Sequence, residues 1–233
     1  MILLLGVLAG LTQAQTSATA PARPGTKFVE SLQAGKPQKI VFFGTSLTQV
    51  GPWVKQVAAA LDEKFPKLVT SANTGKSGEN STWGLANVQK AVIDETPDLV
   101  LIEFTTNDAV DRFHMSVADA RKNIESIIDK IQKACPNCEI VLQTMNPVIG
   151  HPVGDRSHRS DLPAYQQMYR DVGKQRGLKV IDHTPAWQAV LDKGEDQYRA
   201  LVPDGLHPGA PGCAKIVTPA VLAALGVPEG PKK

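Results

Sequence analysis

The sequence predicts an α/β protein, a three-layer α/β/α sandwich built on a parallel sheet of about five strands. Short apolar runs alternate with helical patterns of about ten to twenty residues, which favours right-handed crossovers between parallel strands. The run at 98–104 (DLVLIEF) is apolar except for Asp98 and Glu103, as in a central strand buried on both faces. By analogy the strand order is flavodoxin-like, and ligands then bind outside the carboxyl ends of the strands.

Length and composition predict one globular domain, which we place at residues 28–233. The chain has 233 residues, of which 42% are hydrophobic, enough for a single core. A formal net charge of +2 is too small for a nucleic-acid-binding face. No apolar run reaches the ~18 residues of a membrane span. We therefore expect no nucleic-acid partner and no membrane span, and the sequence leaves the oligomeric state open.

The predicted elements follow one another along the chain. Strands are expected at 39–43, 68–73, 98–104, 139–144 and 178–181. A helix with proline in its first turn is expected at 52–64. A second helix at 116–134 is indicated by the capping box SVAD and by isoleucines at helical spacing. Further helices are expected at 163–175, from Thr184 to Gly194, and from 210 to Gly226 with an interruption at Pro219.

The first residues have the composition of a leader. Residues 1–14 carry no charge and contain an apolar block at 2–11, which predicts a secretory signal peptide. Residues 15–27 are rich in Ser, Thr, Ala and Pro, as in a linker. Because a basic stretch before the apolar block is missing, a buried N-terminal helix is the alternative. The interpretation we adopt is export, to a secreted or periplasmic location.

Three cysteines are present, and Cys135 and Cys138 form a C-x-x-C pair between a predicted helix and a predicted strand. In an exported protein a local disulfide is the simplest interpretation. A zinc site would need two further ligands, and Cys213 lies far away without histidines at finger spacing. A thioredoxin-type pair normally begins a helix, whereas this pair follows one. We therefore expect a disulfide between Cys135 and Cys138.

Three strand ends carry residues suited to acyl transfer. After the first strand, GTSLT places Ser46 two residues past a glycine, and neither a Walker A loop nor G-x-S-x-G is present. After the second, NTGKSGENS offers the backbone N–H of Gly78 to a ligand. After the third, TTND offers the side-chain amide of Asn107. Each of these residues is, on its own, also typical of an ordinary turn.

A fourth motif, DGLHP, places Asp204 and His207 three residues apart near the C-terminus. This spacing lets the carboxylate accept from Nδ1–H while Nε2 faces outward, as a general base requires. The alternative is a solvated histidine in a loop rich in proline and glycine.

Together these motifs, in the order Ser, Gly, Asn and Asp-x-x-His, resemble the SGNH (GDSL-like) hydrolase family of esterases and lipases. The resemblance runs from about residue 40 to residue 225 and rests on the blocks GTSLT, SGENS, TTND and DGLHP. It implies that Ser46 is the nucleophile, His207 the base and Asp204 its orienting partner. It also implies an oxyanion hole formed by the Ser46 N–H, Gly78 and Asn107.

The sequence departs from the family pattern at two places. GTSLT stands where the family usually has GDSL, so an acidic residue is missing directly before Ser46. Thr105 stands where the asparagine block often has glycine. The first departure concerns a contact that supports the nucleophile, and the second concerns the backbone shape of the oxyanion hole.

Further residues at the strand ends are candidates for substrate binding. A serine hydrolase needs no metal and no organic cofactor, because an imidazole and preorganised N–H donors supply the chemistry. The polar loop at 146–163 has histidines and aspartates whose spacing could also bind a divalent cation, but we interpret it as facing substrate or solvent. The expected substrate-binding residues are Thr45, Asn80, Asp108, His151 and His158.

The function expected from these observations is that of a secreted serine esterase acting on carboxylic ester bonds. Export, the polar loop and the family resemblance together favour removal of small acyl groups, acetyl above all, from a carbohydrate or polysaccharide. A lysophospholipase or thioesterase acting on acyl chains is the alternative within the enzyme class. A non-catalytic carbohydrate-binding module with the same fold is the alternative outside it.

Overall fold

The computed structural model describes residues 25–227 and contains one sheet of five parallel strands. The strand order is β2-β1-β3-β4-β5, which is the flavodoxin-like order. The expected fold class is therefore confirmed. The strands are β1 (Gln38–Gly44), β2 (Val69–Asn73), β3 (Leu99–Glu103), β4 (Glu139–Gln143) and β5 (Lys179–Ile181).

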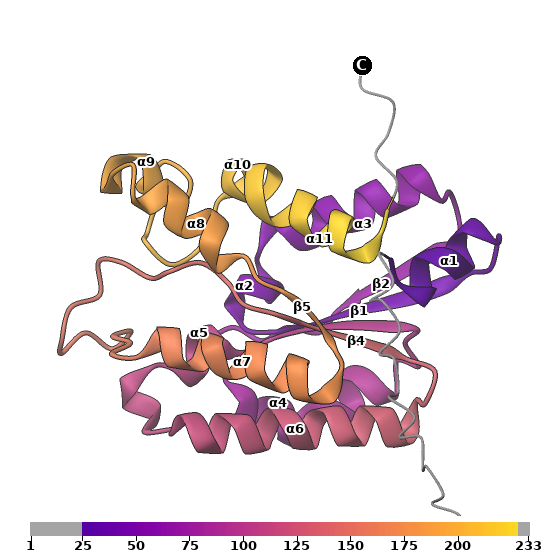
Figure 1. The fold of residues 1–233 in the computed structure, drawn as a ribbon, viewed down its shortest axis with the longest axis horizontal. Helices are drawn as coiled ribbons and strands as arrows, with labels where there is room; N and C mark the ends of the chain where they lie inside the picture. Colours follow the sequence, from indigo (N-terminus) through magenta and orange to yellow (C-terminus); the bar gives the residue numbers. More distant parts are fainter. Residues whose placement is uncertain (1–24, 228–233) are drawn as a thin grey trace, which may run out of the picture.

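Helices cover both faces of the sheet, as Figure 1 shows. On one face lie α1 (Lys27–Gln33), α3 (Pro52–Lys64), α8 (Thr184–Leu191), α9 (Glu195–Arg199), α10 (Ala210–Gly212), the π-helical turn η3 (Cys213–Val217) and α11 (Thr218–Leu225). On the other lie α4 (Ser81–Val88), the π-helical turn η1 (Gln89–Ile93), α6 (Val117–Ala134) and α7 (Leu162–Arg176). Three short helices follow strands β1 and β3: α2 (Ser46–Gln49), α5 (Thr105–Asp108) and the 3₁₀ turn η2 (Asp111–Phe113).

The core consists of two apolar clusters, one on each face of the sheet. All five residues of β3 are buried, which agrees with its expected position at the centre of the sheet. Side chains alternate between the faces of a strand, so Leu99 and Leu101 pack in one cluster and Val100 and Ile102 in the other. This packing leaves the carboxyl ends of the strands free to carry polar loops.

Helix α6 begins as expected. Ser116 Oγ accepts from the Asp119 N–H, and the Asp119 carboxylate accepts from the Ser116 N–H, which completes a capping box. Its buried residues are Ala120, Ile124, Ile127, Ile128 and Ile131.

Helix α4 was not expected from the sequence. It contains Gly84, a residue that lowers helix propensity, yet this glycine is needed for packing. A Cβ there would lie 2.8 Å from Cζ of Phe104. The interior therefore stabilises a helix that local preference does not indicate.

The expected disulfide between Cys135 and Cys138 is wrong, because both are free thiols, as is Cys213. Cys135 ends helix α6 as its C-cap. The Cys138 thiol donates to its own neighbour, the Glu139 carbonyl, at 3.4 Å and packs against the core. Burial raises the pKa of Cys138 to about 12, which makes its thiol unreactive.

The expected leader and most of the expected linker lie outside the described residues. Within them, α1 begins at Lys27, one residue before the expected start of the domain, and Thr26 caps it. Thr26 also donates to the Leu225 carbonyl through its N–H (3.1 Å) and its hydroxyl (2.9 Å), so the two described ends lie together.

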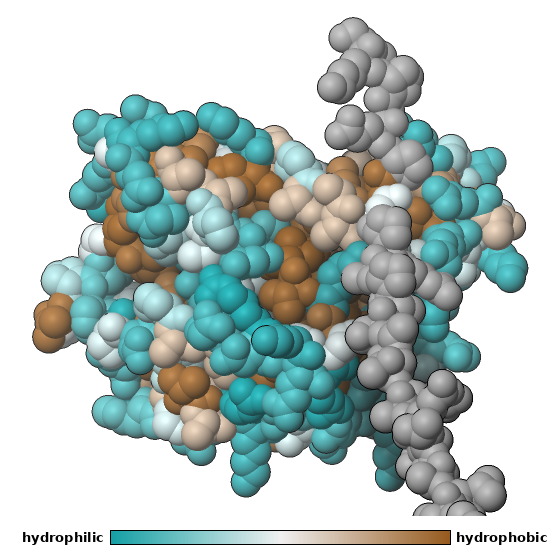
Figure 2. Space-filling model, viewed as in Figure 1, coloured by the Kyte–Doolittle hydropathy of each residue, from teal (hydrophilic) through white to brown (hydrophobic). Residues whose placement is uncertain are grey.

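The surface in the view of Figure 2 is mainly polar, with apolar patches between the helices. Among residues 25–227, no helix combines the length and the apolar character that crossing a membrane requires.

Candidate active site

Ser46 lies at the carboxyl end of β1, as the first residue of α2. Thr45 caps this helix, because its hydroxyl accepts from the Leu47 N–H at 3.2 Å. Gly44 is required by space, since a Cβ there would lie 2.5 Å from the Glu103 carbonyl oxygen. The chain can therefore turn sharply here and present the Ser46 hydroxyl at the strand end.

Ser46, His207 and Asp204 form a hydrogen-bonded line. Ser46 Oγ lies 2.9 Å from His207 Nε2, and His207 Nδ1 lies 2.6 Å from Asp204 Oδ2. The serine and the histidine are 161 residues apart in the sequence, so the fold brings them together. In this arrangement the imidazole can take the hydroxyl proton while the carboxylate holds its tautomer.

The loop that holds His207 is fixed by Asp204 and Gly205. Asp204 Oδ1 accepts from the N–H groups of Leu206 (2.9 Å) and His207 (2.7 Å). Gly205 has a φ of +78°, and a Cβ there would lie 2.2 Å from the Ile149 carbonyl oxygen. Partial burial raises the pKa of Asp204, but the hydrogen bonds from His207 and Leu206 outweigh it and hold that pKa below its usual value. The carboxylate therefore stays charged beside the imidazole.

The candidate oxyanion donors belong to α2, to the loop after β2 and to α5. Gln49 of α2 accepts from the Ser77 N–H at 2.8 Å, which ties the Gly78 loop to the Ser46 helix. Asn107 Nδ2 donates to the Glu79 carbonyl at 2.8 Å, which ties the same loop to α5. Gly78 has a φ of +79°, a backbone conformation that favours glycine.

Two of the residues expected to bind substrate are buried and support the fold. The expectation for Thr45 and Asp108 is wrong, because both are fully buried. Asp108 Oδ1 accepts from the Ser81 N–H at 2.7 Å, and burial raises the pKa of Asp108 to about 7. The Asn80 side chain accepts from the Thr82 N–H at 3.0 Å and caps α4. Thr45 and Asp108 thus hold the loops around the site, and the half-buried Asn80 stays a candidate for substrate contact.

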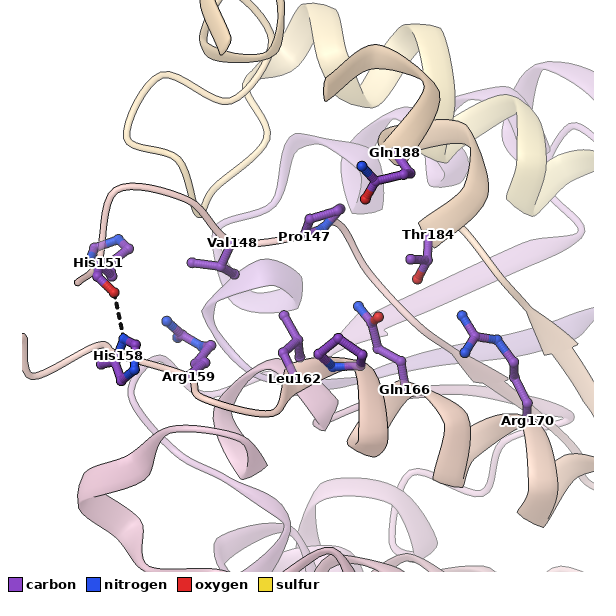
Figure 3. Close-up of a pocket in the computed structure, with 11 residues that line it drawn as sticks. Pro147, Val148, His151, His158, Arg159, Leu162, Gln166, Arg170, Thr184 and Gln188 are labelled. Atoms are coloured by element: carbon purple, nitrogen blue, oxygen red, sulfur yellow. Dashed lines mark hydrogen bonds between the residues drawn. The ribbon is translucent and has the colours of Figure 1, made fainter. Parts of the chain in front are cut away.

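His151 and His158 lie in the loop after β4 and line a cavity of about 430 Å³ (Figure 3). His151 Nδ1 is 3.2 Å from Asp155 Oδ1, and His158 Nδ1 is 2.7 Å from the His151 carbonyl oxygen. Within residues 25–227, His, Cys, Asp and Glu side chains form no group of three that could hold a metal ion. The histidines thus remain candidates for substrate contact.

Glu103 is a buried residue that sequence reasoning missed. Its Oε2 accepts from the Thr45 N–H (3.2 Å) and hydroxyl (3.0 Å) and from the Thr48 hydroxyl (3.2 Å). Burial raises the pKa of Glu103 to about 8, although the hydrogen bonds from Thr45 and Thr48 lower it. The only signal in the sequence was a single acidic residue at the end of an apolar strand.

Arg159 is the second residue that was missed. Its NH2 donates to Asn107 Oδ1 at 3.3 Å, and its Nε donates to the Thr106 carbonyl at 2.5 Å. The Asn107 amide is thereby oriented, because its oxygen faces Arg159 while its nitrogen faces the Gly78 loop. Nothing in the sequence near Arg159 indicates this contact, which crosses 52 residues.

Comparison with known proteins agrees with this fold. A GDSL-like lipase from Parabacteroides merdae has 19% sequence identity and a TM-score of 0.74 over 83% of this chain and 97% of its own. An acetylxylan esterase from Geobacillus stearothermophilus has 22% identity and a TM-score of 0.70 over 83% and 96%. An α/β hydrolase from the metagenome of Lake Arreo has 22% identity and a TM-score of 0.69 over 84% and 98%. At these identities the likeness shows a shared fold.

The fold is thus the α/β fold of these solved structures, with a serine at the end of its first strand. The model of the GDSL-like lipase/acylhydrolase family matches residues 42–215. The chain therefore belongs to this family and is a serine hydrolase that cleaves acyl esters. Comparison with curated proteins gives no match.

Proposed function

We propose that the protein is an esterase whose catalytic triad is Ser46, His207 and Asp204. The observation that carries the proposal is the line of two hydrogen bonds from Ser46 Oγ through His207 to Asp204. A serine hydroxyl is a poor nucleophile unless a base takes its proton. Here Nε2 of His207 lies at the right distance to do so.

In the proposed reaction, Ser46 Oγ attacks the ester carbonyl while His207 accepts its proton. The alcohol then leaves with that proton, and water hydrolyses the acyl-enzyme by the reverse transfer. The negative oxygen of each tetrahedral intermediate needs preorganised donors. We assign these to the Ser46 N–H, the Gly78 N–H and Asn107 Nδ2.

A short acyl group fits the space beside the nucleophile. A cavity of about 20 Å³ there is lined by Ser46, Val50, Trp53 and His207, among others. On this measure a site for one water needs about 10–15 Å³, so the room is of the order of one small group. This supports acetyl rather than long acyl chains as the group transferred to Ser46.

Two observations support a carbohydrate as the alcohol part of the substrate. The cavity of about 430 Å³ is lined by polar as well as apolar side chains, including Thr184, Gln166 and Gln188 (Figure 3). The structurally similar acetylxylan esterase acts on an acetylated polysaccharide, and its catalytic mutants replace a serine, a histidine or an aspartate by alanine. We also propose export of the protein, on the uncharged, apolar composition of residues 1–14.

A panel of esters tests the proposal. We expect p-nitrophenyl acetate to be hydrolysed faster than the octanoate, acetylated oligosaccharides to be better substrates still, and EDTA to have no effect. Because each buried CH₂ adds about 0.8 kcal/mol, a lysophospholipase or thioesterase would gain steeply with chain length. A tenfold preference for the octanoate would establish that alternative, and no hydrolysis of any ester would favour a binding module.

A further inference from the structure

The cavity drawn in Figure 3 lies at the carboxyl ends of β4 and β5, between α7 and α8. Ligands of open parallel sheets bind at this edge. The described residues that line it include four basic or imidazole side chains and no acidic one. These four are His151, His158, Arg159 and Arg170.

The two arginines differ in their partners. Arg170 forms a two-point ion pair with Asp182, with Nε 2.8 Å from Oδ2 and NH2 3.1 Å from Oδ1. The half-buried Arg159 donates only to neutral oxygens, those of Thr106, Ser157 and Asn107. No carboxylate of residues 25–227 lies within ion-pair distance of it. Burial lowers the pKa of Arg159 to about 10, so it is still a cation at neutral pH.

An anionic ligand would stabilise the charge of Arg159. A partly buried charge without a counter-ion in contact is costly. A guanidinium has five N–H groups, of which Arg159 uses three inside the protein. In addition, His151 Nε2 is buried and has no hydrogen-bond partner within the described chain. If Nδ1 donates to Asp155 Oδ1, this nitrogen is an acceptor without a donor.

Residues at the cavity contact two segments of the proposed active site. Arg159 lines it and at the same time donates to Asn107 Oδ1. Pro147 and Val148 also line the cavity. The next residue, Ile149, donates its N–H to the carbonyl of Gly205, which lies two residues before His207. The cavity is thus connected to the proposed oxyanion donor Asn107 through Arg159 and to the loop of His207 through Ile149.

We propose that this cavity is a subsite for a carboxylate-bearing sugar, a uronate unit adjacent to the acetylated unit of the substrate. Arg159 binds the carboxylate, the polar side chains of Gln166 and Gln188 contact hydroxyls, and Val148 and Leu162 cover the C–H face of the ring. A volume of about 430 Å³ lies in the range of small-ligand pockets, about 300–1,000 Å³. The proposal rests on the esterase function proposed above and names its substrate class.

The test compares an O-acetylated uronate oligosaccharide with a neutral O-acetylated oligosaccharide of the same length. We expect kcat/KM at low salt to favour the uronate substrate by about tenfold, as for one charge-assisted contact. Arg159→Gln abolishes this ratio, and Gln188→Glu, which places a carboxylate on the exposed rim, lowers it. The matched control is Arg156→Gln, an exposed arginine of the same loop outside the cavity, which leaves the ratio unchanged. Equal kcat/KM for both substrates, or a ratio that survives Arg159→Gln, overturns the proposal.

A second readout needs no catalysis. The Ser46→Ala protein is titrated calorimetrically with the deacetylated uronate oligosaccharide and with its neutral counterpart. We expect binding of the uronate alone, weakened by about tenfold in the Ser46→Ala, Arg159→Gln double variant. If the wild type does not hydrolyse p-nitrophenyl acetate, the esterase assignment is wrong. If the Ser46→Ala protein binds the two sugars with equal affinity, the subsite proposal is wrong.

Discussion

The carboxyl group of Glu103 accepts hydrogen bonds from both the backbone N–H and the hydroxyl of Thr45, the residue directly before Ser46. Gly44 pairs with Glu103 in the parallel register of β1 and β3, so the neighbouring strand brings this carboxyl to the turn. An acid from β3 thus lies beside the turn at which GTSLT has no acidic residue. Thr45 in turn caps the helix that presents Ser46.

Removing this carboxyl should disturb the nucleophile turn. Glu103→Ala leaves the buried Thr45 N–H and hydroxyl without an acceptor, at a cost of about 1–3 kcal/mol for each group. We expect a lower free energy of unfolding and a kcat for p-nitrophenyl acetate reduced by about tenfold or more. Glu103→Gln, which keeps a neutral acceptor, retains most of the activity. The control is Glu63→Ala, at an exposed position of α3. Equal activity of the alanine and glutamine variants would contradict this role.

The raised pKa of Glu103 also predicts how stability depends on pH. Between its ordinary value of 4.5 and about 8, the folded state keeps a proton that the unfolded chain has lost. The folded state then binds more protons, so the free energy of unfolding falls as pH rises through this window. Glu103→Gln lacks this contribution, so its free energy of unfolding falls less over the same pH window. The decrease that remains comes from other groups such as Asp108, whose pKa is about 7. Denaturant unfolding of both proteins across the window measures the difference; parallel curves would refute the assignment.

Asn107 and Arg159 should act as one unit. Removing an oxyanion donor costs about a hundredfold to a thousandfold in kcat, which we expect for Asn107→Ala with little change in KM. Arg159→Gln frees the amide to rotate and lowers kcat for p-nitrophenyl acetate less severely. In the Asn107→Ala background Arg159→Gln adds little, because contacting residues are not additive. Two fully additive losses would show that Arg159 acts independently of Asn107.

The three thiols can be counted directly. We expect the denatured, unreduced protein to take up three alkylating groups, at Cys135, Cys138 and Cys213. In the native protein Cys213 is 1% exposed and burial raises its pKa to about 11, so it reacts slowly. Mass spectrometry of the labelled protein checks both statements. A single label before reduction would show that Cys135 and Cys138 form a disulfide after all.

The features that could be predicted from the sequence are those set by residues close together in the chain. The five strands and α6 follow from apolar spacing and a capping box, and the Asp204 and His207 pair lies within one loop. Glu103 and Arg159 could not be assigned, because their partners lie 58 and 52 residues away. Thr45 and Asp108 show the same limit: a strand end indicates a site, but which polar side chain turns inward depends on the packing of several elements.

The central claim is that Ser46, activated by His207, forms the covalent intermediate. The most direct measurement is the site of modification by a serine-directed organophosphate, located by peptide mass spectrometry. We expect one adduct, on Ser46, formed in step with the loss of esterase activity, and a rate of modification reduced by at least about a hundredfold in His207→Ala. An adduct on another residue, or a Ser46→Ala protein that still hydrolyses p-nitrophenyl acetate at the wild-type rate, would contradict the account.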